Sequence, residues 1–188
     1  MNIIQQFFIN LFKPIWLREN SSGDRFKFKE SKERQLAAVN ALRDPMKLQR
    51  AAFEAPEPYV RVAAVDKIND AEVLKTVALN DKDYWVRRVA VKKISDMEVL
   101  KTVALNADKD IRLMATHKLF EIAPMDAAEP MVELLTFKNL DEKDFLFLTK
   151  SLRFLYAKLD DQGLKDKIWR SQKRYDVRRH MDGYDQGG

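Results

Sequence analysis

Cysteine is absent from this 188-residue chain, which excludes disulfides, thiolate catalysis and thiolate metal sites. Glycine and proline number only 5 and 6, too few for the turns of a many-stranded β fold. The sequence has no glycine-rich phosphate loop and no serine-centred nucleophile elbow. Its two histidines, His117 and His180, are far apart and lack a partner at metal-ligand spacing, so a structural role is expected for His117. We therefore expect a helical protein that is not an enzyme, with no catalytic residue, metal site or cofactor.

No stretch is long enough and apolar enough to span a bilayer. Residues 1–17 predict an amphipathic helix, for which two interpretations remain open. It caps the repeats that follow, or it docks on a membrane or a partner. Its polar face carries Asn and Gln rather than Lys, which argues against tight binding to anionic lipid. We do not interpret it as a signal peptide, because a basic leader and a small-residue cleavage site are missing, and we expect a cytoplasmic protein.

An internal repeat is the strongest feature of the sequence. Residues 72–80, Glu-Val-Leu-Lys-Thr-Val-Ala-Leu-Asn, recur without change at 98–106, an offset of 26 residues. The segments before them also match, and looser copies occur upstream and downstream. Such a period is typical of repeat proteins, in which each unit buries its apolar face only against its neighbours. The units that follow from these matches span residues 34–59, 60–85, 86–110 and 111–136.

Each unit is predicted to form two short helices. Val62, Val65 and Ile68 recur at helical spacing in the first helix of one unit. Asn69 with Glu72, and likewise Ser95 with Glu98, have the spacing of a capping box at the start of the second helix. The predicted fold is all-α, an α-α superhelix that forms a right-handed solenoid of about four helix pairs with capping helices at both ends.

The first helices resemble the HEAT-like repeats of bacteria, including the short form shared with the phycobilisome-lyase type. The resemblance lies in a polar loop with Asp, followed by Val-Arg at the start of a helix of Ala and aliphatic residues, and it covers about residues 34–120. It is carried by Asp81 with Val86-Arg87, by Val60-Arg61 and by Ile111-Arg112. The loop Asp occurs only before Val86, since Ala55 and Asn106 hold the equivalent places. The resemblance implies a fold and a general habit of binding, not a specific activity.

The ends of the chain differ from the repeats. Residues 1–33 are predicted to be an amphipathic helix followed by a charged linker, which begins near residue 18. Residues 34–160 form the solenoid, closed by a capping helix over Asp141–Leu159. Residues 161–188 are predicted to be a basic tail, helical over Leu164–Arg179 and disordered from Asp182 onward.

The leading functional hypothesis is a non-enzymatic scaffold that binds a protein or peptide partner through the solenoid surface. If the second helices line the concave face, their lysines point into a shallow groove. Aromatic residues at equivalent positions before Val-Arg form either a binding hot spot or the filling of the seam between units, and the seam is favoured because large aromatics usually bury. The predicted partner-binding residues are Tyr59, Lys75, Trp85, Arg88 and Lys101. The oligomeric state is left open.

Nucleic-acid binding is the alternative. The repeat offset aligns basic residues into an arginine column (Arg61, Arg87, Arg112) and a lysine column (Lys67, Lys93, Lys118). Acidic residues interleave with them and leave the repeats nearly neutral, so the net charge of +5 resides at the two ends of the chain. Binding would therefore use the basic termini. The candidate residues of the tail are Lys165, Arg170, Lys173, Arg174, Arg178 and Arg179.

Four loop carboxylates could suggest a divalent-ion site. Helix capping, together with pairing to Arg87 or Arg112, is the favoured explanation for them. They are Asp81, Asp83, Asp108 and Asp110.

Overall fold

The computed structural model describes residues 25–137 and 140–184, with side chains placed for 31–137 and 140–173. All regular structure in these ranges is helical, which confirms the predicted all-α fold of consecutively packed helices. The chain divides into two compact units, with the boundary after Lys93. The predicted N-terminal helix over residues 1–17 lies outside the described residues.

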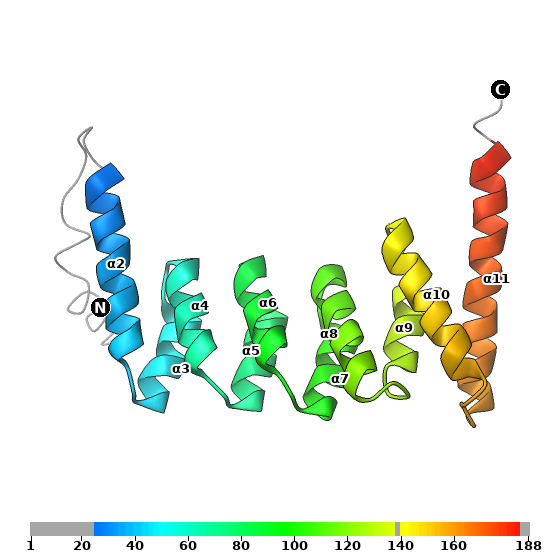
Figure 1. Cartoon of the computed structure of the whole chain (residues 1–188), viewed down its shortest axis with the longest axis horizontal. Coiled ribbons are helices and arrows are strands. Elements are labelled where there is room, and N and C mark those ends of the chain that lie inside the picture. Colours follow the sequence, from blue (N-terminus) through cyan, green and yellow to red (C-terminus); the bar gives the residue numbers. More distant parts are fainter. Residues whose placement is uncertain (1–24, 138–139, 185–188) are drawn as a thin grey trace. The chain divides into compact units, whose positions relative to one another are not determined.

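The first unit contains a run of short helices joined by three-residue loops (Figure 1). Helix α3 packs against α4 and α5 packs against α6, while α4 contacts both α2 and α6. Residues from Arg25 onward are helical, so the linker predicted over residues 18–33 is wrong from residue 25 onward. The helices are α2 (Arg25–Ala41), α3 (Pro45–Glu54), α4 (Pro58–Lys67), α5 (Ala71–Asn80) and α6 (Tyr84–Lys93).

The second unit begins with the other identical copy of the repeat and ends with longer helices. Helix α7 packs against α8, and the short α9 contacts α7, α8, α10 and α11. The last helix extends five residues past the predicted end at Arg179, so residues 182–184, predicted to be disordered, are helical. The helices are α7 (Met97–Asn106), α8 (Lys109–Ile122), α9 (Ala128–Leu134), α10 (Glu142–Tyr156) and α11 (Gln162–Tyr184).

Aspartates cap the second helices of the repeats, α3, α5 and α7. The carboxylates of Asp70 and Asp96 accept hydrogen bonds from the backbone N–H groups of Val73 and Val99, at 3.0 and 2.9 Å. The predicted capping boxes are therefore wrong by one residue, since the N-cap is the Asp that follows Asn69 or Ser95. An ionised carboxylate at this position also interacts favourably with the helix dipole, which a neutral Asn or Ser side chain does not.

The core repeats with the sequence. Ala64 and Val65 of α4 and Ala90 and Val91 of α6 are all fully buried, at positions 26 residues apart. The second helices bury a matching set, in which the small alanine lets neighbouring helices approach closely. This set comprises Leu74, Val77 and Ala78 in α5, and Leu100, Val103 and Ala104 in α7. Each repeat thus builds its core from the same set of buried positions.

Candidate functional site

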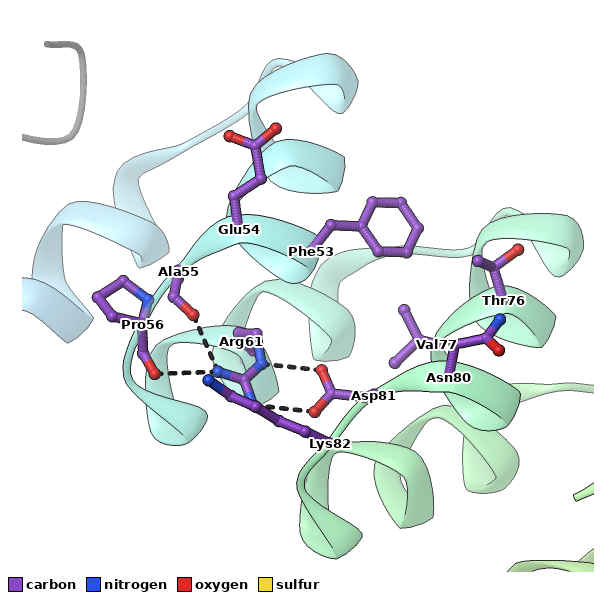
Figure 2. A pocket seen from close by; sticks show the side chains of 10 residues that line it. All are labelled: Phe53, Glu54, Ala55, Pro56, Arg61, Thr76, Val77, Asn80, Asp81 and Lys82. Atoms are coloured by element: carbon purple, nitrogen blue, oxygen red, sulfur yellow. Dashed lines mark hydrogen bonds and ion pairs between the residues drawn. The ribbon is translucent and has the colours of Figure 1, made fainter. Parts of the chain in front are cut away.

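A pocket of about 290 Å³ lies in the first unit, beside the ends of α3 and α5 (Figure 2). Arg61, only 2% exposed, is one of the residues that line it. Its Nε and Nη2 donate to the two carboxylate oxygens of Asp81 at 2.8 and 2.9 Å, and its Nη1 donates to the carbonyls of Ala55 and Pro56 at 2.9 and 3.1 Å. These bonds bind the start of α4 to the loops after α3 and α5. The guanidinium is therefore committed to the fold, and the pocket is built on a structural ion pair.

The partner of Asp81 differs from the prediction. Its carboxylate binds Arg61, twenty residues earlier, rather than Arg87. Arg87 instead donates from Nη1 to the main-chain carbonyl of Asp81 at 2.7 Å. This bond repeats the one between Arg61 and the carbonyl of Ala55, 26 residues earlier, so Arg61 and Arg87 of the arginine column anchor their first helices to the loops before them. The predicted capping role is confirmed for Asp83 and Asp108, which accept from backbone N–H groups of α6 and α8.

The lysine column is also used within the fold. Lys67 Nζ donates to the carbonyls of Asn40 and Leu42, both at 2.6 Å, at the end of α2. Lys93, 26 residues later, donates in the same way to the carbonyl of Asp66 in α4. A cation at a helix C-terminus satisfies carbonyls left over by the helix and offsets the negative end of its dipole. These two lysines are positioned by the fold and do not form an open track for phosphates.

Three residues of α6 form a cluster around one exposed ring, which we call the Trp85 cluster: Trp85 with the half-buried Tyr84 and Arg88. Trp85 is 60% exposed, so the favoured prediction that it fills a seam is wrong. Its ring meets that of Tyr84 edge to face, with centroids 5.4 Å apart, and the Arg88 guanidinium lies 5.2 Å from its centre. The Asp83 carboxylate accepts a hydrogen bond from the backbone N–H of Trp85 at 2.9 Å. Backbone and side chain of Trp85 are thus held in place while its ring faces solvent.

Tyr59 holds the equivalent position on α4 but is half-buried. Its hydroxyl bonds to the Gln35 side chain, and Lys32 Nζ lies 5.1 Å from its ring centre. Burial, with a smaller contribution from Glu57, raises the pKa of the Tyr59 hydroxyl. Tyr59 therefore packs against α2, which distinguishes it from Trp85.

The two lysines predicted to line a groove are paired within their own units. Lys75 forms an ion pair with Glu72 on α5. Lys101 Nζ lies 3.6 Å from the carboxylate of Asp126. Of the predicted partner-binding residues, the structure thus brings together only Trp85 and Arg88. No property of the sequence distinguishes those two from the others, since pairing depends on the helix surface that each residue occupies.

His117 of α8 stacks on the Phe147 ring of α10, with centroids 3.6 Å apart and planes 13° from parallel. Burial lowers the pKa of His117, although the carboxylates of Asp144 and Glu121 oppose this shift. Burial and Asp141 raise the pKa of Asp144. The arrangement favours a neutral imidazole packed between helices, as the structural role predicted for His117 requires.

This geometry predicts a loss of stability in mild acid. Because the pKa of His117 is lowered from 6.5 in the folded chain, the unfolded chain binds its proton first as the pH falls. Stability due to this group is complete above about pH 6.5 and is lost as the pH drops to the folded-state pKa. The raised pKa of Asp144 acts in the opposite sense at lower pH. Urea unfolding of His117→Phe between about pH 7 and pH 5.5 should show a flatter profile than the parent. An unchanged profile would contradict the assignment.

Aromatic side chains paired with lysines lie on α10 and α11. Lys158 Nζ is 4.2 Å from the ring centre of Phe154, and Lys173 Nζ is 4.9 Å from that of Trp169. Lys165 of α11 lies 5.7 Å from the ring centre of Tyr156 of α10. Lys165 and Lys173 of the predicted basic set therefore contact aromatic rings, and Arg170 is exposed beside Trp169. The remaining members of the set, Arg174, Arg178 and Arg179, belong to α11.

Within the described part of the chain, no cluster of His, Asp or Glu has the arrangement of a metal site. Among the described helices, none has the length and apolar character needed to cross a membrane. Comparison of the chain with protein-family models, with curated proteins and with solved structures finds no match. The interpretation of function therefore rests on the surfaces described above.

Proposed function

We propose that this protein is a non-enzymatic helical-repeat scaffold that binds a protein partner through the Trp85 cluster. The observation that carries the proposal is an indole that is 60% exposed yet fixed by Tyr84 and Arg88. Trp, Tyr and Arg are the residue types most enriched among the energetic hot spots of protein interfaces. The HEAT-like character of the repeats, which we also propose, agrees with such a role because repeat proteins present rigid binding surfaces.

Preorganisation favours the Trp85 cluster over the other predicted residues. An exposed side chain loses conformational entropy when a partner immobilises it, at a cost of about 0.5–1.5 kcal/mol for a rotamer-rich group. Trp85 has already lost part of that freedom, because Asp83 fixes its backbone and Arg88 lies over its ring. Lys75, by contrast, would have to give up its ion pair with Glu72 in order to bind. The cluster therefore offers apolar area at a low entropic cost.

Site-specific photo-crosslinking at position 82, an exposed lysine three residues before Trp85, keeps the indole in place; capture in cells, followed by affinity measurements with the captured protein, tests this function. Trp85→Ala should weaken binding of that protein at least about tenfold, as expected of a hot-spot residue. Trp169→Ala is the matched control, since Trp169 is 55% exposed and also lies against a cation. The Trp169→Ala variant should bind the captured protein as tightly as the parent does. Failure to capture any protein at position 82, or equal effects of the two substitutions, would refute the proposal.

A further inference from the structure

We propose a second binding site, for single-stranded nucleic acid, on the hairpin of α10 and α11. The site consists of Tyr156 and Trp169 together with Lys165 and Lys173, and we call it the lysine–aromatic surface. It lies in the second unit and does not depend on the function proposed for the Trp85 cluster.

The rings of this surface are open to solvent. Trp169 is 55% exposed, and Tyr156 is 40% exposed. Each has an ammonium group within 6 Å of its centre, at 4.9 Å for Trp169 and 5.7 Å for Tyr156. Base stacking on aromatic side chains contributes about 1–3 kcal/mol per base and tolerates any sequence. A ring with a neighbouring cation thus matches one nucleotide, since the base stacks and the phosphate meets the ammonium.

The hairpin beneath these residues is rigid. Leu155 of α10 and Ile168 of α11 are fully buried, and the two helices contact each other. Tyr156 and Trp169 directly follow these anchors in sequence, and their exposed rings are therefore carried on a packed base. Lys165 reaches from α11 to the Tyr156 ring on α10, so the surface is continuous across the two helices.

Charge favours a polyanion as the occupant. Basic residues outnumber acidic ones in the segment 153–173, and α11 continues with Arg174, Arg178 and Arg179. The basic residues of the segment are Arg153, Lys158, Lys165, Lys167, Arg170 and Lys173, against Asp160, Asp161 and Asp166. Phosphates paired with lysines release condensed counterions, which supplies affinity that falls with salt.

The neighbours of the rings argue against a lipid surface. A helix that lies in a membrane interface places aliphatic residues beside its aromatics to form a broad apolar face. The residues three and four positions from Trp169, which share its helix face, are instead Lys165, Asp166, Gln172 and Lys173. Duplex nucleic acid also fits less well, because its bases are already stacked and cannot cover the rings. A single strand is therefore the ligand that can use both the exposed rings and the lysines of this surface.

Fluorescence anisotropy with a labelled oligothymidylate of about 15 nucleotides, the upper range of a small single-strand site, tests the proposal on the full chain. Trp169→Ala should weaken binding about tenfold through the loss of one stacked base. Lys165→Gln with Lys173→Gln should lower the slope of log affinity against log salt by about 1.4, since each phosphate contact on a single strand contributes about 0.7. Circular dichroism verifies that the exposed positions leave the fold intact.

Matched controls separate the site from general charge. Trp85→Ala should bind the oligonucleotide as the parent does. Lys47→Gln with Lys82→Gln removes two exposed lysines of the first unit and should leave the salt slope nearly unchanged. The proposal is overturned by an absence of binding at about 50 mM salt, where phosphate contacts are strong. It is equally overturned if Trp169→Ala binds normally, or if duplex DNA or phosphatidylglycerol vesicles bind as tightly as the single strand.

Discussion

Asp81→Ala is expected to lower the free energy of unfolding by about 3–5 kcal/mol, because it leaves the guanidinium of Arg61 buried without its counter-charge. Arg61 is 2% exposed and would lose two hydrogen bonds, of 2.8 and 2.9 Å, while the carbonyls of Ala55 and Pro56 still hold only Nη1. Urea denaturation followed by circular dichroism measures the loss.

The matched control is a surface ion pair a few residues away. Arg50 and Glu54 lie 3.1 Å apart on α3, with side chains 31% and 36% exposed. Glu54→Ala should cost no more than about 0.5 kcal/mol, as is usual for an exposed pair one helical turn apart. The double variant Arg61→Met with Asp81→Ala should recover much of the loss, since an apolar side chain replaces the unpaired charge. Equal costs for Asp81→Ala and Glu54→Ala would show that the buried pair has no special role.

Leu74→Ala and Leu100→Ala are expected to cost about 3 kcal/mol each, within the range for deletion of a buried leucine side chain. The two residues occupy the same place in identical nine-residue segments, and they are 2% and 0% exposed. The same experiment therefore measures one substitution in two units of one protein.

A surface leucine provides the reference for this pair. Leu146 of α10 is 48% exposed, and Leu146→Ala should cost well under 1 kcal/mol by comparison with the buried sites. Costs for Leu74→Ala and Leu100→Ala that differ several-fold would contradict the inference that identical sequence gives equivalent packing. Thermal unfolding monitored by calorimetry gives an independent measurement.

The sequence predicts the helices well because the repeat shows which positions share an environment. The alanines and valines that are buried in α4 recur as buried residues in α6, and the period alone is enough to find them. The start of each second helix is predicted only to within one residue, because Asn69-Asp70 and Ser95-Asp96 each offer two adjacent capping residues. The geometry of the loop then selects the aspartate.

The candidate site is less predictable. Tyr59 and Trp85 hold equivalent positions, yet Tyr59 is covered by Lys32 and Gln35 while Trp85 is exposed. The difference comes from the preceding helix: 26 positions after Lys32 and Gln35, α4 has Pro58 and Arg61, and Arg61 is bound to Asp81. The pairing of Arg61 with Asp81 joins residues twenty positions apart, and periodicity does not indicate which of two nearby arginines a loop carboxylate will reach. Tertiary contacts of this kind are specified by helix packing rather than by spacing along the chain.

The lysine bonds of the first helices have a consequence for how such a chain lengthens. Lys67 and Lys93 each bind main-chain carbonyls, so the acceptor requires no particular side chain and is Asn40 in one case and Asp66 in the other. A duplicated 26-residue segment would therefore arrive with its own lysine donor and its own carbonyl acceptor. Tandem duplication of the gene segment extends the array without any compensating mutation at the new junction, and the acceptor positions remain free to diverge afterwards.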